Sequence, residues 1–211
     1  MVDPGKPYHH GDLRAALLAR AESRLATEGP SSLSLRELAR EVGVSHGAPR
    51  QHFRTKQALL DALAESGFAR LGQELDAAMA GNDGSFIESL TVFAQTYVRF
   101  AARHPALLDL MFATLHRSGA DPGLRQANDR AFAAPTALIA NAQATGDIVD
   151  DDPDRVAMAV LATLQGLAWL ATSHTIGNRS VDAVVAGTIE TLTYGLKPKR
   201  SSTSRRQRPG A

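Results

Sequence analysis

Apolar side chains recur every three to four residues along most of the chain, and short breaks rich in glycine, proline or aspartate separate the runs. This spacing puts the apolar side chains on one face of a helix, so it predicts an all-α fold. Pro135 should kink or split one of the helices. The predicted helices cover residues 13–28, 35–42, 45–53, 56–80, 85–103, 105–115, 124–145, 154–175 and 180–196.

We therefore expect about nine helices in two domains, since 211 residues suit one or two domains. Residues 1–57 should form a first domain of three helices. Residues 58–196 should form a C-terminal helical bundle, followed by a disordered basic tail over residues 197–211. The helix over residues 56–80 begins in the first domain and ends in the second, so it can act as a lever between them.

The helix-turn-helix prediction depends on residues 33–56. Ser34 and Glu37 have the spacing of a capping box. Gly43 can end the first helix in the left-handed conformation, and Ser45 can cap a second helix. Small residues near the turn allow two helices to cross closely, as a DNA-binding helix-turn-helix requires. The apolar face of the first helix contains Leu35, Leu38, Ala39 and Val42.

The predicted second helix, over residues 45–53, carries polar side chains that suit the major groove, where arginine reads guanine and glutamine reads adenine. Pro49 should stiffen its first turn. Thr55 should cap the next helix, and its N-terminus with Lys56 can attract a phosphate. A solvated polar helix face is the competing interpretation. The candidate DNA-binding residues are Ser34, Ser45, His46, Gly47, Arg50, Gln51, His52, Thr55 and Lys56.

This stretch resembles the DNA-binding domain of the TetR family of bacterial transcriptional regulators. The likeness extends outward through Tyr8-His9-His10-Gly11-Asp12-Leu13-Arg14 and Phe53-Arg54-Thr55-Lys56-Gln57-Ala58-Leu59-Leu60. Landmarks similar to the WHG-type C-terminal regulatory domain of one branch follow at His104-Pro105-Ala106-Leu107, Leu110-Met111-Phe112 and Gln165-Gly166-Leu167. The resemblance implies a ligand-responsive regulator, most often a repressor, that binds a palindromic operator as a homodimer.

Two departures from the family pattern limit which residue roles can be transferred from the family to this chain. Where the family usually has a phosphate-contacting tyrosine, this chain has Arg50, which can also bind phosphate. An operator sequence borrowed from relatives is therefore in doubt. Thr163-Leu164-Gln165-Gly166 replaces the Trp-His-Gly landmark, and Trp169 follows three residues after the glycine.

Charge is strongly partitioned along the chain. Residues 1–60 contain nine Lys/Arg against six Asp/Glu, residues 61–195 contain eight against sixteen, and residues 196–211 contain six against none. A basic end on an acidic body favours an anionic partner at that end. Without cysteine, disulfides and thiol redox sensing are excluded. We expect a cytoplasmic, nucleoid-associated protein with no membrane partner, because no apolar run approaches a membrane span.

No enzyme motif is found: the chain has no Gly-x-Ser-x-Gly, phosphate-binding loop, His-Glu-x-x-His or dinucleotide fingerprint. We expect no catalytic residue, cofactor or metal. The pair His9 and His10 lacks further ligands of suitable geometry. The acidic run over residues 150–154 lacks the glycine turn and distal glutamate of an EF-hand, and a helix N-terminus explains it more simply.

The last two predicted helices are broadly apolar, so we expect them to pair with a second copy in a four-helix interface. Burial inside a monomer is the competing interpretation. The body should bind a small, mainly apolar effector. The candidate pocket residues, for which plain core packing is the alternative, are Phe93, Tyr97, Met111, Phe112, His116, Phe132, Gln143, Gln165 and Trp169.

Two other classes of function compete with the regulator. One is a helical small-molecule-binding protein with weak or vestigial DNA binding, which would bind ligand tightly without specific DNA affinity. The other is an all-helical enzyme acting on an apolar substrate, for which no set of residues can be nominated.

Overall fold

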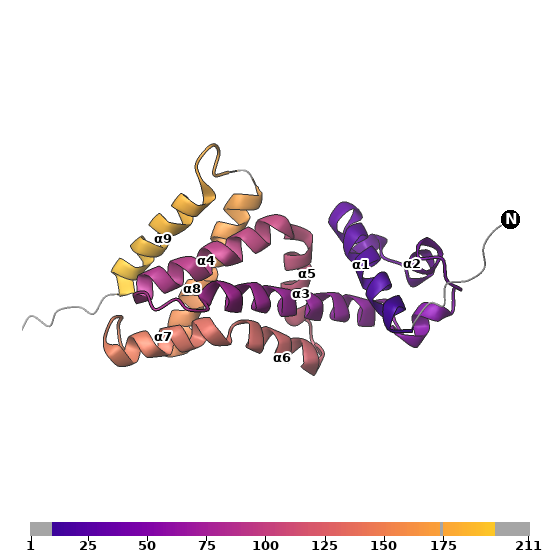
Figure 1. The fold of residues 1–211 in the computed structure, drawn as a ribbon, viewed down its shortest axis with the longest axis horizontal. Helices are drawn as coiled ribbons and strands as arrows, with labels where there is room; N and C mark the ends of the chain where they lie inside the picture. The colour runs from indigo at the N-terminus through magenta and orange to yellow at the C-terminus, as the bar shows by residue number, and fades with distance from the viewer. Residues whose placement is uncertain (1–9, 174, 197–211) are drawn as a thin grey trace, which may run out of the picture.

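The computed structural model describes residues 10–173 and 175–196, and these residues form helices and connecting turns without strands. The predicted all-α fold is confirmed (Figure 1). Tyr8, His9 and the predicted basic tail over residues 197–211 lie outside the described residues. The elements are α1 (His10–Glu28), η1 (Pro30–Ser32), α2 (Leu35–Glu41), η2 (Ala48–Gln51), α3 (Lys56–Met79), α4 (Phe86–Arg103), α5 (Pro105–Leu115), α6 (Pro122–Ala131), α7 (Ala133–Thr145), α8 (Pro153–Thr172) and α9 (Val181–Leu196).

Two proline positions change the predicted helices. The prediction of an α-helix over residues 45–53 is wrong. Only the 3-10 helix η2 forms there, because Pro49 has no N–H to donate to the Ser45 carbonyl. The N–H of Ala48 donates to that carbonyl instead, at 3.0 Å. The helix expected over residues 124–145 splits at Phe132, one turn before Pro135, whose missing N–H leaves the Ala131 carbonyl without its helical donor. One predicted α-helix is thus lost and one is gained.

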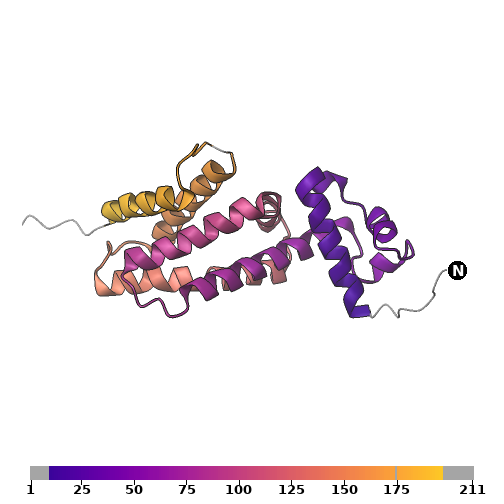
Figure 2. The ribbon, with the colours of Figure 1, turned by 45° about the horizontal axis from the view of Figure 1, so that its top comes forward.

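Helix α3 connects the two parts of the molecule, as Figures 1 and 2 show. At one end it packs against α1, and along its length it packs against α4, α5 and α6. Two glycines bring it close to its neighbours. A Cβ atom at Gly67 would lie 2.6 Å from the sulfur of Met111 on α5, and one at Gly72 would lie 3.1 Å from the Cα of Ala131 on α6. A movement of α5 or α6 therefore presses directly on α3.

The rest of the body is built around α4, which packs against α3, α7, α8 and α9. A capping box starts α4: the Ser85 N–H donates to Glu88 at 2.8 Å, and the Glu88 N–H donates back to the Ser85 hydroxyl. Phe93, Tyr97 and Phe100 on α4 are completely or almost completely buried. One continuous apolar core runs from α1 through α3 and α4 to α9.

Helix α8 bears on the expectation that the chain has no membrane partner. Among the described residues it is long and apolar enough to cross a membrane by length and composition. Such a helix is a weak indicator by itself, since the core helices of soluble proteins satisfy the same criterion. Only 28% of this stretch is buried within the single chain. Much of its apolar surface therefore faces outward.

Candidate nucleic-acid interface and ligand cavity

The first helix of the helix-turn-helix starts where the sequence predicts, but its cap differs. Ser34 occupies the N-cap position of α2 in extended conformation, yet its side chain makes no capping hydrogen bond. The predicted capping box is therefore wrong. The Glu37 carboxylate instead accepts a hydrogen bond from Arg24 on α1 at 2.7 Å, because a charge-assisted bond to a guanidinium is stronger than one to a backbone amide.

The turn between α2 and η2 has the predicted glycine geometry. Gly43 is in the left-handed region with φ of 76°, and the Val44 N–H donates to the Ala39 carbonyl at 2.9 Å. Ala39 is completely buried at this crossing. After η2, the buried Phe53 ring anchors the segment, with the Arg14 guanidinium of α1 lying 5.6 Å from its centroid. The short η2 is thus held in place at both ends.

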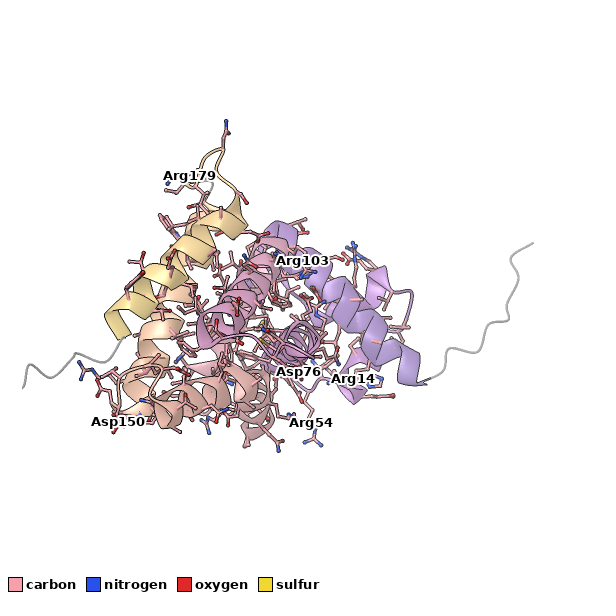
Figure 3. All side chains as sticks on the ribbon, turned by 60° about the vertical axis from the view of Figure 1, so that its left-hand side comes forward. Arg14, Arg54, Asp76, Arg103, Asp150 and Arg179 are labelled. Atoms are coloured by element: carbon pink, nitrogen blue, oxygen red, sulfur yellow. The ribbon has the colours of Figure 1, made fainter. Side chains whose placement is uncertain are left out.

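A groove of about 740 Å³ runs between the start of α2, η2 and the start of α3. Six of the nine predicted DNA-binding residues line it: Ser34, His46, Gly47, Arg50, Thr55 and Lys56. Arg36 and Arg54 line it too, although the sequence reasoning did not select them. Arg54 is exposed and extends away from the ribbon (Figure 3). The only sequence signal for these two arginines is their position: Arg36 is two residues after Ser34, and Arg54 is next to Thr55.

The three remaining predicted DNA-binding residues lie outside this groove. Ser45 and Gln51 are exposed beside it. His52 is half-buried, and its ring lines a separate hollow of about 220 Å³ that also contains Arg14, Phe53 and Asp61. Its Nε2 atom is buried and has no hydrogen-bond partner among the described residues. His52 therefore faces the junction between α1 and α3.

The start of α3 adds a second positive feature to the groove. The predicted cap is confirmed, since the Thr55 hydroxyl accepts a hydrogen bond from the Ala58 N–H at 3.1 Å. Lys56 is the first residue of this long helix, and its Nζ donates to the Ser31 carbonyl at 2.8 Å. The partial positive charge of a helix N-terminus and the lysine ammonium together attract an anion.

Two arginines of α1 are already neutralised by glutamates. Arg20 pairs with Glu41 at 2.6 Å, and Arg24 pairs with Glu28 at 2.6 Å and with Glu37 at 2.7 Å. The hydrogen bond from Arg20 lowers the pKa of the Glu41 carboxyl, so this pair stays ionised. No ion pair forms within the described residues for the groove residues Arg36, Arg50, Arg54 and Lys56. Four cations without an ion pair among the described residues therefore line the groove.

The body contains a cavity of about 460 Å³ between α4, α5, α6, α7 and α8. Four of the nine predicted pocket residues line it: Phe93, Phe112, His116 and Phe132. Further lining is supplied mainly by apolar residues of α7 and α8, which the sequence reasoning did not select: Pro135, Ile139, Ala157, Met158, Val160, Leu161 and Leu164. The composition of this lining suits a mainly apolar small molecule.

The five other predicted pocket residues do not line this cavity. Met111 packs against Gly67 of α3, and Tyr97 is completely buried behind the lining. Gln143 donates to the carbonyls of Asp151 at 2.8 Å and Val149 at 3.3 Å, so it fastens the loop before α8. Gln165 is half-buried on α8, and Trp169 is 64% exposed on the same helix. Large exposed apolar side chains at Met158, Trp169 and Tyr194 mark the outer faces of α8 and α9.

Family models match most of the chain. Residues 17–63 match the family described as bacterial regulatory proteins, tetR family. Residues 90–192 match the family described as tetracyclin repressor-like, C-terminal domain. The first match covers the helix-turn-helix and the start of α3, and the second covers the cavity and most of α9. The more specific WHG branch stays a prediction.

Similar proteins and structures agree with these matches. A protein of unknown function from Rhodococcus sp. RHA1 is 44% identical with a TM-score of 0.83, over 92% of this chain and 100% of that one. A TetR family transcriptional regulator, PfmR, from Thermus thermophilus has a similar fold, with 20% identity and a TM-score of 0.62 over 86% of this chain and 99% of that one.

The nucleoid occlusion factor SlmA of Aliivibrio fischeri is 28% identical over 115 residues. The aligned region covers 53% of this chain and 55% of SlmA, so the chain spans about half the length of the curated relatives it matches.

Proposed function

Because the chain belongs to the TetR family of bacterial regulatory proteins, and is thus a DNA-binding transcriptional regulator rather than an enzyme, we propose how it acts. In this proposal it is a homodimeric repressor that binds a palindromic operator in double-stranded DNA. Binding of a small, mainly apolar effector in the body modulates that affinity. Residues 1–57 serve DNA binding and residues 58–196 serve ligand binding and dimerisation, in the cytoplasm on the nucleoid.

The observation that carries the DNA-binding proposal is the distribution of paired and unpaired cationic side chains around the helix-turn-helix. Arg36, Arg50, Arg54 and Lys56 line one groove without acidic partners among the described residues, while Arg20 and Arg24 of α1 are paired with glutamates. Phosphates release counterions when such unpaired cations meet them, which supplies sequence-independent affinity. Arg50 and His46, on the exposed side of η2 and its preceding turn, are the proposed base-reading residues.

The dimer proposal is supported by the apolar surface that a single chain leaves outside. Trp169 on α8 and Tyr194 on α9 are each 64% exposed, and Met158, also on α8, is 63% exposed. Large exposed apolar side chains that gather into a patch are typical of protein interfaces. Pairing α8 and α9 with a second copy would present two grooves to DNA, and a palindromic operator requires them to reach major grooves roughly 34–36 Å apart.

The modulation proposal is supported by the path from the cavity to α3. Phe112 on α5 and Phe132 between α6 and α7 line the cavity, and both α5 and α6 pack closely against α3 through Gly67 and Gly72. A ligand that prefers one position of these helices shifts α3 and thereby the distance between the two grooves. The size of the shift in population is limited by the difference in affinity for the two states.

Selection of bound fragments from genomic DNA by the purified full-length protein tests DNA binding and finds the operator together. We expect fragments that share a palindromic element and a protein dimer on that element in analytical ultracentrifugation. The matched variant pair is Arg50→Ala, in the groove, and Arg20→Ala, on the paired side. Recovery of random fragments, or equal enrichment by both variants, would contradict the proposal.

The second candidate is a helical ligand-binding protein with weak DNA binding. One observation favours it: η2 is a four-residue 3-10 helix where a longer recognition helix was expected, so fewer side chains can reach base edges. Specific binding of genomic fragments would exclude this candidate. Absence of such binding, together with tight ligand binding, would favour it.

A further inference from the structure

A buried phenol on α4 has an unused hydrogen-bonding group. Tyr97 is completely buried, and its hydroxyl has no hydrogen-bond partner among the described residues. A buried donor without a partner destabilises a protein, so such a group calls for an explanation. Burial also raises the pKa of the Tyr97 hydroxyl, which therefore keeps its proton and remains a donor at physiological pH.

This hydroxyl belongs to a side chain directly behind the ligand cavity. Tyr97 follows Phe93 by one helical turn on α4, and Phe93 lines the cavity. The ring of Phe132, another lining residue, contacts both: its centroid lies 6.4 Å from that of Phe93 and 6.3 Å from that of Tyr97. Phe132 thus lines the cavity and also contacts Tyr97. It lies at the break between α6 and α7 and is only half-buried, so its ring can turn without disturbing a helix interior.

The other cavity residues limit the charge of a ligand. No lysine or arginine is found among the described residues that line the cavity. Asp154, at the start of α8, lines it and is exposed. An anion in this apolar cavity would face a carboxylate and would have no lysine or arginine to compensate its charge, which is costly. A neutral ligand avoids this cost.

We propose that the effector is a neutral, mainly apolar molecule with a carbonyl-type acceptor, and that this acceptor displaces the Phe132 ring and accepts a hydrogen bond from the Tyr97 hydroxyl. The inference rests on the proposed function, because it names the ligand class of the same cavity. It also gives the ligand a route to α3. Phe132 ends α6, and α6 packs against Gly72 of α3 through Ala131, the residue next to Phe132.

The test compares two probes that differ in one group. Benzophenone and diphenylmethane share two phenyl rings, and a carbonyl in the first replaces a methylene in the second. Dissociation constants of both probes are measured by thermal shift and by calorimetry on the wild type, Tyr97→Phe and Tyr194→Phe. Tyr194→Phe is the matched control, because it removes the same atom from a tyrosine on α9 that is 64% exposed. We expect the affinity ratio of benzophenone to diphenylmethane to fall about three- to tenfold in Tyr97→Phe alone.

Three outcomes are informative. A ratio that falls only in Tyr97→Phe supports the inference. An unchanged ratio in all three proteins overturns the role of the hydroxyl, while the bound probes still support an effector cavity. If neither probe binds any of the proteins, both this inference and the effector part of the proposed function fail, whereas DNA binding is judged separately by fragment selection.

Two further measurements guard against a purely structural effect. Ligand-free Tyr97→Phe should unfold at the same or a higher temperature than the wild type, because it loses an unpartnered buried donor. A fall of several degrees would show that the hydroxyl is already satisfied in the folded protein and would overturn the inference. Ultraviolet irradiation attaches benzophenone to nearby C–H groups, and mass spectrometry should find the label within residues 93–97 or 132–139. Labelling confined to other residues would also overturn it.

Discussion

The two ends of α3 meet different kinds of neighbour. Its first turn lies in the groove with the unpaired cations of the helix-turn-helix, and Thr55 and Lys56 face solvent there. Its second half is enclosed by apolar side chains, with Phe68, Leu71 and Leu75 completely buried. One end is therefore suited to a charged partner that comes from outside, while the other end responds to the packing of α5 and α6.

This difference predicts which perturbations each end tolerates. Electrostatic contacts at an exposed end are screened by salt. Removing one charged side chain there changes the stability of the fold little. Close packing at a buried end has no spare volume, so an added methyl group there strains the helix contact. Substitutions at the first end should alter DNA affinity without changing stability, and substitutions at the second should alter stability first.

The largest effect should come from Gly72→Val. Even the first carbon of a side chain at Gly72 would lie 3.1 Å from the Cα of Ala131, which is backbone and cannot move aside alone. Overpacking of this kind typically costs about 1–3 kcal/mol, so we expect a loss near the upper end of that range. Urea unfolding followed by circular dichroism measures it.

Gly166→Val on α8 is the matched control for this prediction. The same substitution is made inside a helix, but nothing lies within 4 Å of the added Cβ atom. Measured on the monomer, because α8 belongs to the proposed dimer face, its free energy of unfolding should stay close to that of the wild type, since valine has a somewhat better helix propensity than glycine. Equal destabilisation by both variants would show that the contact between α3 and α6 is not tight.

The next effect belongs to the groove. Arg50→Ala should weaken operator binding by about 1–3 kcal/mol if the guanidinium reads a base, and the loss should be larger for the operator than for random DNA. The unfolding free energy should not change, since Arg50 is exposed. Fluorescence anisotropy with both DNAs at fixed salt measures the two affinities. An unchanged operator affinity would remove Arg50 from the site.

Sequence reasoning located the elements better than it located their contacts. Two local predictions succeeded: the N-cap of α3 by Thr55 and the left-handed conformation of Gly43 after α2. Both depend only on neighbours within four residues. The capping box at Ser34 failed because Arg24, from a different helix, takes the Glu37 carboxylate. A local spacing rule contains no information about a competing partner that the fold brings in from elsewhere.

The two prolines were predicted with different success. The helix over residues 124–145 was expected to kink or split because of Pro135, and it does split, at Phe132, because the missing N–H of a proline affects the carbonyl one turn earlier. The same chemistry at Pro49 turned an expected α-helix into η2. The cavity was harder still: its lining combines several helices, so residues such as Ile139 and Leu164 could not be selected before the crossing of those helices was known.

A smaller effect should appear in the salt dependence of binding. If Lys56 meets a DNA phosphate, Lys56→Ala should lower the slope of log affinity against log salt by about one unit for all sequences. In the free protein its Nζ donates to the Ser31 carbonyl at 2.8 Å, so the same group also holds the residues before α2 near the groove. Anisotropy titrations at four salt concentrations give the slope, and an unchanged value would mean that the ammonium points to solvent in the complex.

The smallest effect should be a pH dependence of stability from the joint between α1 and the body. His104 lies between α4 and α5, with its Nδ1 3.8 Å from the Glu22 carboxylate of α1, which also pairs with Arg70 at 2.9 Å. Burial, followed by the charge of Arg70 and then that of Arg103, lowers the pKa of His104, while Glu22 and Glu74 oppose the shift. The folded chain therefore takes up this proton at lower pH than the unfolded chain.

Between the lowered pKa and the usual value of about 6.5, the unfolded state binds more protons, so stability falls as the pH falls through this window. His104→Asn should flatten the dependence of the unfolding free energy on pH there, and the contribution removed cannot exceed about 1.4 kcal/mol per pH unit. Glu22→Gln should extend the window to lower pH, because one of the two carboxylates that favour the protonated ring is lost and the folded-state pKa falls further. Urea unfolding at a series of pH values compares the three proteins, and parallel curves for all of them would show that the joint carries no titrating group.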